Sequence, residues 1–255
     1  IWDDAGVDWS SFDAVVVRST WDYTRRREEF LAWARRMPRL LNDAGTLGWN
    51  TDKSYLRFLA ASGVPIVPTS FIDPGLAPSE VELDPSWDQV VVKPNVSADA
   101  ADTARFAADD PAWRSLADRI QASGRVVLIQ PYLPLIEASG ETSLIYLGGS
   151  YSHAIRKSPL LRSYGETDRP YPAIASREPS EAERALGERT LAALKHCRGA
   201  LDRPPVYARV DMAPGPSGEP VLMELELTEP SLYLSYDASG RAAARFAAAI
   251  LSALD

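Results

Sequence analysis

Three acidic residues near the C-terminus are spaced so that they could share a metal ion. Glu224 and Glu226 alternate with apolar residues in the segment 221–227, so in a β-strand both carboxylates point to one face. The turn before this segment is rich in glycine and proline and predicts a hairpin with the strand 207–212, which would place Asp211 beside Glu224. An ordinary strand with a solvated acidic face remains the alternative.

Carboxylates without a histidine nearby favour Mg²⁺, which takes one or two carboxylates and completes its shell with water and substrate phosphates. A magnesium site in turn suggests a nucleoside triphosphate, whose phosphates need cations. Lys93 ends the apolar segment 89–93 and Pro94 follows it, so its ammonium group leaves a buried strand at a fixed place. A lysine that simply reaches solvent from a strand end is the competing interpretation.

Two further segments could complete a nucleotide site. Residues 95–103 are small, so their backbone N–H groups could approach a phosphate, although the glycines of a P-loop are absent. The apolar strand 126–129 runs into the connector 130–133, which could offer backbone groups and apolar surface to a purine ring. An ordinary interdomain linker would have the same composition. Only the order of the lysine strand, the connector and the acidic hairpin distinguishes a nucleotide site from it.

A polar segment follows the short apolar strand expected at 14–18, and polar residues at the carboxyl end of a strand favour a ligand site. Arg18 could pair with a carboxylate and Asp22 with an amine. Trp21 and Tyr23 could instead be packing residues that fix the loop. With two residues just beyond the acidic strand, the candidate substrate contacts are Arg18, Ser19, Thr20, Trp21, Asp22, Glu229 and Ser231.

The elements that must position these residues predict an α/β protein built from α+β subdomains. Helices are expected over 28–36, 53–62, 111–123, 180–197 and 239–254. Alternating strands at 142–147, 151–157, 207–212 and 221–227 predict an antiparallel sheet. Prolines near 65 and 131 suggest three domains spanning 1–65, 66–130 and 131–255.

Composition narrows the class of protein. The 255 residues are 45% hydrophobic and carry a formal net charge of −8, which argues against nucleic acid or an anionic membrane as a partner. The single cysteine, Cys197, excludes an internal disulfide and fits a reducing cytoplasm. No apolar run approaches the ~20 residues of a membrane span. The first residue is Ile1, so we expect an incomplete N-terminal domain.

The order of these segments resembles the ATP-grasp superfamily, in which an adenine nucleotide is held between two α+β subdomains. The resemblance runs from Trp49 to the C-terminus, through TDKSYLRFLAASGVPIVPT, VVVKP, VLIQPYL, GETSLIYL and ARVDMAPGPSGEPVLMELELTEPS. Within that superfamily, VVVRSTWDY and MELELTEPSLYL are most similar to the O-ureido-serine cyclo-ligases of cycloserine biosynthesis and related bacterial enzymes. Glutathione synthetase and D-alanine–D-alanine ligase are more distantly similar.

The resemblance implies an ATP-grasp fold behind an α/β pre-grasp domain, with ATP and two Mg²⁺ ions. It implies nucleotide contacts from Lys53, Lys93, Gln130, Tyr132, Leu133 and Glu141, catalytic roles for Arg209 and Arg156, and metal ligation by Asp211, Glu224 and Glu226. Two features depart from the superfamily. The phosphate loop of better-known members is rich in glycine, and many members have asparagine at the position of Glu226.

The implied activity is an ATP- and Mg-dependent carboxylate–amine ligase that releases ADP and phosphate from a small amino-acid-like substrate. Bond formation could be intramolecular, closing a small ring. A phosphotransferase of the same superfamily and a nucleotide-binding module without catalysis are the alternatives, and a homodimer and a monomer are both open. The segment 158–171 is a candidate cover, with Arg156 and Lys157 at its root. We assign no metal or base role to His153 or His196.

Overall fold

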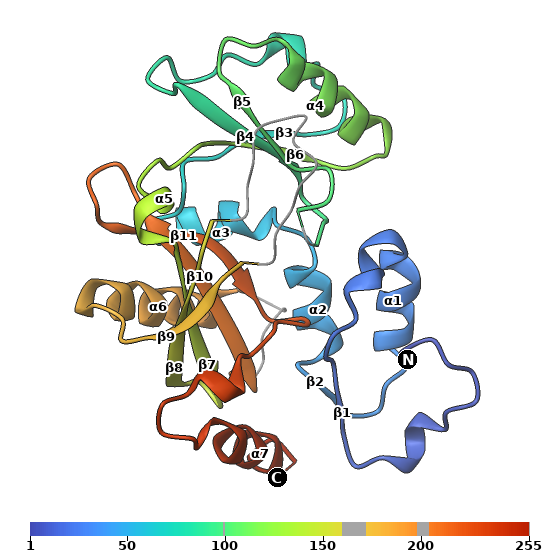
Figure 1. The fold of residues 1–255 in the computed structure, drawn as a ribbon. Coiled ribbons are helices and arrows are strands. Elements are labelled where there is room, and N and C mark those ends of the chain that lie inside the picture. Colours follow the sequence, from blue (N-terminus) through green and yellow to red (C-terminus); the bar gives the residue numbers. More distant parts are fainter. Residues whose placement is uncertain (99, 160–171, 198–203, 255) are drawn as a thin grey trace.

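Residues 1–98, 100–159, 172–197 and 204–254 are described by the computed structural model, and they fold around three β-sheets (Figure 1). The strands are β1 (Val15–Val16), β2 (Leu40–Leu41), β3 (Ser70–Ile72), β4 (Gln89–Pro94), β5 (Ala104–Ala107), β6 (Val127–Pro131), β7 (Glu141–Leu147), β8 (Ser150–Lys157), β9 (Ile174–Arg177), β10 (Tyr207–Pro214) and β11 (Pro220–Glu226). One sheet is the parallel pair β1-β2, and the two others are antiparallel.

The helices of the structure cover most of the residues that the sequence predicts to be helical. They are α1 (Arg27–Ala34), α2 (Ala44–Asn50), α3 (Tyr55–Ala61), α4 (Ala112–Ala122), α5 (Ile136–Ser139), α6 (Glu181–Ala193) and α7 (Ala242–Ser252), with 3₁₀ turns η1 (Trp9–Ser11), η2 (Trp21–Arg25), η3 (Pro78–Glu80), η4 (Leu194–His196) and η5 (Leu234–Tyr236). The five predicted helices are confirmed, whereas α2 and α5 were not predicted. In the described ranges, no helix is long and apolar enough to cross a membrane.

The N-terminal segment packs around aromatic side chains. β1 and β2 pair in parallel, and α1 covers them with the face that the sequence predicts to be apolar. Trp2 meets Phe30 edge to face at 5.4 Å, and Tyr23 stacks on Phe30 at 5.1 Å between ring centroids. The turn η2, which carries the candidate substrate residues Trp21 and Asp22, is therefore anchored through Tyr23 to the core beneath α1.

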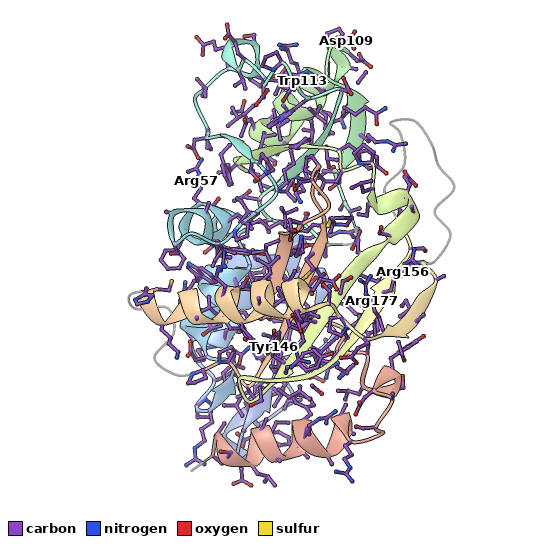
Figure 2. All side chains as sticks on the ribbon, turned by 90° about the vertical axis from the view of Figure 1, so that its left-hand side faces the viewer. Arg57, Asp109, Trp113, Tyr146, Arg156 and Arg177 are labelled. Atoms are coloured by element: carbon purple, nitrogen blue, oxygen red, sulfur yellow. The ribbon has the colours of Figure 1, made fainter. Side chains whose placement is uncertain are left out.

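The middle of the chain forms the four-stranded sheet β3-β6-β4-β5, with α4 packed on it (Figure 1). The predicted strands at 89–93 and 126–129 and the helix at 111–123 are confirmed as β4, β6 and α4. β3 and β5 were not predicted, because each is short, with three and four residues. α4 buries Trp113 fully against Val90 and Val92 of β4, so this unit has a hydrophobic core of its own (Figure 2).

The larger sheet has the order β11-β10-β7-β8-β9, which confirms the predicted antiparallel sheet and adds β9 as its edge. One face packs against α3 and α6, through residues such as Leu144 and Val210. Residues of opposite parity, including Ile145 and Tyr207, pack toward α7. Arg209 and Asp211 have the parity of Tyr207, so strand alternation puts them on the α7 side of β10.

Two buried asparagines from the N-terminal segment hold the end of the hairpin. Asn42 donates to the carbonyls of Tyr207 and Leu227 at 3.0 and 2.8 Å. Asn50 donates to the Leu225 carbonyl at 2.7 Å and accepts from the Leu227 amide at 2.6 Å. Asn50 thus satisfies the outer edge of β11 as a neighbouring strand would, and so fixes the strand that carries the acidic residues.

Replacing Asn50 with alanine is expected to lower the free energy of unfolding by about 3 kcal/mol, because it leaves buried backbone groups of β11 without partners. Urea denaturation followed by circular dichroism measures this change. Gln121→Ala is the matched control: Gln121 also donates to two carbonyls, those of Asp73 and Leu76, but at an exposed site where water replaces it. Equal losses in the two variants would contradict the proposed role of Asn50.

Candidate active site

The acidic hairpin forms as the sequence predicts. β10 and β11 are antiparallel neighbours, and Asp211 lies directly opposite Glu224. In the same register Arg209 lies opposite Glu226, and the pairing shifts by a bulge just after Asp211. The hairpin therefore gathers one guanidinium and three carboxylates within two rungs of the ladder.

Arg209 is the centre of this group. Its guanidinium donates to both carboxylate oxygens of Asp211, with Nε at 2.9 Å from Oδ1 and Nη2 at 2.8 Å from Oδ2. It also donates to the carboxylate of Glu226 and, through Nη1, to the Ser231 carbonyl at 3.2 Å. Burial opposes its charge, but Asp211 and Glu226 more than offset this and hold the pKa of Arg209 well above its ordinary value.

Lys157, which the sequence placed with Arg156 at the root of the candidate cover, joins the group from β8. Its Nζ lies 3.2 Å from Asp211 Oδ2 and 3.1 Å from Glu141 Oε2, and the side chain is buried. Despite its burial, Asp211 has a lowered pKa, because Arg209 and Lys157 are close to it. Arg209 and Lys157 are thus both charged, and they lie in contact with the carboxylates.

The structure does not bring Arg156 to this cluster. Arg156 is exposed and donates to the Ala138 carbonyl of α5 (Figure 2). Successive side chains of a strand point to opposite faces, so only one of Arg156 and Lys157 can face Asp211. Of these two residues, the structure therefore brings Lys157, and not Arg156, into contact with Asp211. Gly140 allows this arrangement, because a Cβ there would lie 2.5 Å from the Lys157 carbonyl oxygen.

Lys53 connects the smaller sheet to the hairpin. Its Nζ donates to the Ser97 carbonyl at 2.8 Å and lies 3.1 Å from Glu224 Oε1. Ser97 belongs to the loop after β4, so this lysine ties the predicted phosphate loop to the predicted metal ligand. Lys93 lies close enough for the charges of Glu224, Lys53 and Glu141 to affect its pKa. The two predicted phosphate-binding lysines therefore converge on the same carboxylates.

Nucleotide affinity is expected to fall as pH rises through about 8, because burial lowers the pKa of Lys93 to about 8, a shift that Lys53 increases and Glu224 and Glu141 partly offset. Below this pH the ammonium is present and pairs with phosphate; above it, binding must take up a proton. Calorimetry of ADP binding at pH 9 in two buffers of different ionisation enthalpy measures that uptake. Lys93→Met is expected to abolish it, and equal heats for the wild type in both buffers would contradict the assignment.

The donor set fits Mg²⁺. All candidate ligands are carboxylate oxygens, and burial with repulsion from neighbouring carboxylates raises the pKa of both Glu226 and Glu229. A divalent cation would relieve that repulsion. Among the described residues, no three acidic, histidine or cysteine side chains are arranged as a ready ligand set. Glu224 pairs with Lys53 and Glu226 with Arg209. Mg²⁺ needs only one or two carboxylates besides water and phosphate, so Asp211 and Glu224 suffice as its core.

The hinge after β6 is more tightly packed than the sequence indicates. Gln130 is buried and donates to Thr69 Oγ1 at 2.9 Å, and Leu133 packs in a small core with Val67. The Tyr132 ring lies under the guanidinium of Arg105, 4.3 Å from its centroid, and its hydroxyl hydrogen-bonds Glu137. The Tyr132 amide already donates to the Gln89 carbonyl at 2.8 Å, so this amide is not available to adenine.

The N-terminal candidate substrate residues differ in whether their side chains already have partners. Asp22 accepts a hydrogen bond from the Trp2 indole at 3.1 Å, so its carboxylate anchors the N-terminal residues and is already paired. Trp21 is 46% exposed, which excludes the packing role considered for it. Arg18 lies over the Phe246 ring of α7 at 5.6 Å. In the part of the chain that the structure describes, Arg18 Nε and Thr20 Oγ1 are buried without hydrogen-bond partners.

Glu229 and Ser231 lie beside the acidic cluster. Burial raises the pKa of Glu229 to about 8, with Glu226 as the next contribution. Burial raises the pKa of Tyr23 well above its ordinary value, and the charge of Glu229 is the next contribution. Ser19 has a left-handed backbone, with φ of 56°. Most of the candidate cover, residues 160–171, and Asp99 of the phosphate loop lie outside the described residues.

Solved structures define the class. The D-alanine–D-alanine ligase of Bacillus anthracis matches with a TM-score of 0.60 and 19% identity, over 83% of this chain and 69% of that one. The ATP-grasp ligase PsnB, complexed with minimal precursor, Mg and ADP, matches with a TM-score of 0.57 and 17% identity, over 95% and 78%. The fold is that of the ATP-grasp ligases, as the sequence predicts.

Closer relatives give the family. The N-terminal domain family of D-cycloserine synthetase DcsG matches residues 1–42. The cycloserine biosynthesis protein DcsG of Streptomyces lavendulae is 39% identical over 264 residues, covering 99% of this chain and 87% of the relative. A crystal structure of D-cycloserine synthetase DcsG matches with a TM-score of 0.90 and 37% identity, over 100% of this chain and 88% of that one. The chain belongs to the DcsG family and is an ADP-forming ATP-grasp ligase that joins a carboxylate to an amine.

Proposed function

We propose that the protein closes a small ring within one amino-acid-like molecule, of the kind made by cycloserine synthetases. The observation that carries the proposal is the 39% identity to a cycloserine biosynthesis protein over 99% of the chain. Further support is that Arg18 Nε and Thr20 Oγ1 are buried without hydrogen-bond partners among the described residues, since buried polar atoms of this kind suit a small polar substrate.

The proposed reaction has two steps. The terminal phosphoryl group of ATP passes to an oxygen of the substrate carboxylate, which releases ADP. A nitrogen of the same molecule then attacks the carbonyl carbon, and phosphate leaves with the carboxylate oxygen. The protein's main task is to place these groups and to neutralise the phosphoryl charge.

Each part of the site has a proposed role in this reaction. Lys53 and Lys93 bind the phosphates of ATP, and Gln130, Tyr132, Leu133 and Glu141 line the rest of the nucleotide. Arg209 and Lys157 supply positive charge toward the transferred phosphoryl group. Asp211, Glu224 and Glu226 would hold Mg²⁺, as two ions, and the metal would supply positive charge to neutralise the phosphates. Arg18, Ser19, Thr20, Glu229 and Ser231 contact the substrate.

The proposal is tested by incubating the protein with O-ureidoserine, ATP and Mg²⁺, and following ADP and the product by mass spectrometry. The expected result is ADP, phosphate and a cyclised product. Oxygen-18 in the substrate carboxylate is expected to appear in phosphate. Release of AMP and pyrophosphate would refute the proposed phosphoryl transfer, and a product that keeps the phosphoryl group would refute cyclisation. ATP as co-substrate and a single cysteine both favour the cytoplasm as the site of action.

A further inference from the structure

The segment after β11, residues 229–236, contains a backbone conformation that its side chain does not favour. Tyr233 is left-handed, with φ of 46° and ψ of 39°, although it is not a glycine. A bulky residue adopts this conformation only when the surroundings impose it. The segment is held by Arg209, which donates to the Ser231 carbonyl at 3.2 Å and lies over the Tyr233 ring, 5.8 Å from its centroid.

His153 of β8 holds the same segment at two further carbonyls. Its Nε2 lies 3.0 Å from the Leu232 carbonyl oxygen and 3.1 Å from that of Tyr233, and the side chain is buried. Two carbonyls require Nε2 to be the donor, so Nδ1 accepts the Ser152 hydroxyl at 2.9 Å. A neutral imidazole meets this requirement. The charged groups around His153 are Asp237 and Arg245.

The left-handed turn and the histidine belong together. Consecutive carbonyls of an extended strand point in opposite directions, so they reach one donor only if the backbone turns between them. The turn at Tyr233 brings the two oxygens to the same Nε2. The Tyr233 carbonyl also accepts from the Tyr236 amide at 2.8 Å, which closes η5. His153 therefore compensates the strain of Tyr233 and fixes how the chain leaves the acidic strand.

We propose that His153 is a positioning residue for substrate binding, which sets the place of Ser231 and Glu229 by fixing the Leu232–Tyr233 turn against β8. This inference rests on the proposed function, because that function assigns Ser231 and Glu229 to the substrate. His153 contacts the Leu232 and Tyr233 carbonyls, whereas Arg209 contacts that of Ser231. Loss of His153 is thus expected to affect the substrate and to leave the nucleotide site, formed by β4, β6 and Lys53, intact.

The test compares two near-isosteric variants. In His153→Gln the amide nitrogen takes the place of Nε2 and keeps the donor, whereas in His153→Asn the side chain ends at the place of Nδ1 and loses it. We expect His153→Asn to raise the KM for O-ureidoserine about tenfold, the effect of one lost buried hydrogen bond, while the KM for ATP stays within about twofold. His153→Gln is expected to restore most of the loss. His196→Gln, at an exposed histidine of η4, is the matched control.

Hydrogen exchange of the protein without ligands tests the positioning independently of the reaction. In His153→Asn we expect faster exchange within residues 231–237, including the Tyr236 amide, and unchanged exchange in β4 and β6. Unchanged exchange in 231–237, or a His153→Gln variant as impaired as His153→Asn, would overturn the inference. Absence of turnover by the wild type would count against the proposed function alone, since the exchange comparison still decides the role of His153.

Discussion

Replacing Arg209 with lysine is expected to reduce kcat for substrate-dependent ADP release by roughly 10²–10³-fold, the usual effect of removing one preorganised donor from a transition state. Lysine keeps the charge but not the planar fork that reaches Asp211, Glu226 and the Ser231 carbonyl together. The lysine charge still neutralises Asp211 and Glu226, so the fold is expected to persist. The measurement is a coupled ADP assay at saturating ATP and O-ureidoserine, with circular dichroism to verify folding.

Arg189→Lys on the exposed face of α6 is the control for the arginine-to-lysine change itself. It is expected to leave kcat unchanged. A folded Arg209→Lys protein with wild-type kcat would show that the guanidinium neutralises Asp211 and Glu226 without taking part in the reaction. A raised KM for ATP with unchanged kcat would place Arg209 in ground-state nucleotide binding instead.

The acidic hairpin could be predicted because its signals are local. The alternation at Glu224 and Glu226 fixes which side chains share a face, and the short turn fixes the strand opposite them. The side-chain period of a strand is two, so these signals were enough to place Asp211 against Glu224. The same rule applied to β8 shows that Arg156 and Lys157 cannot both face the site, but it does not show which one does. That choice depends on the pairing with β7, where Lys157 lies opposite Glu141.

Other site-forming residues leave no local signal. Asn50 bonds to residues 175 and 177 positions away in the chain, and His153 reaches residues 79 and 80 positions away. An isolated asparagine or histidine has no period or spacing that reveals such a partner. The residues that hold the acidic strand and the following turn are therefore visible only in the folded chain, although the carboxylates themselves were found from sequence.

The charges of the site predict that nucleotide and metal bind together. Lys53 pairs with Glu224, Lys157 with Asp211 and Glu141, and Arg209 with Asp211 and Glu226, so these cations and carboxylates neutralise one another. A nucleotide that arrives with several negative charges must draw the lysines away from the carboxylates. Mg²⁺ can then replace the lysines at the carboxylates, while the lysines turn to phosphate. Nucleotide and metal are thus expected to bind with positive cooperativity.

Replacing Glu224 with glutamine is expected to lower turnover by about 10²-fold or more at ordinary Mg²⁺ concentrations, because a neutral amide is a poor substitute for a metal-binding carboxylate. The amide keeps the shape of the side chain and still accepts from Lys53, so the fold is expected to persist. Part of the loss is expected to return at high Mg²⁺, and Mn²⁺ binding in the presence of ADP, followed by electron paramagnetic resonance, reports the lost affinity directly.

Glu219→Gln is the matched control, because Glu219 is exposed at the turn of the same hairpin and the change in net charge is identical. It is expected to keep wild-type turnover and Mn²⁺ affinity. Full turnover by Glu224→Gln would refute the metal assignment. Since Lys53 would then lose its carboxylate partner without consequence, that result would also remove the argument that metal and lysine exchange places at Glu224. A loss of ADP affinity in Glu224→Gln that Mg²⁺ cannot restore would mean instead that Glu224 acts by orienting Lys53 toward phosphate.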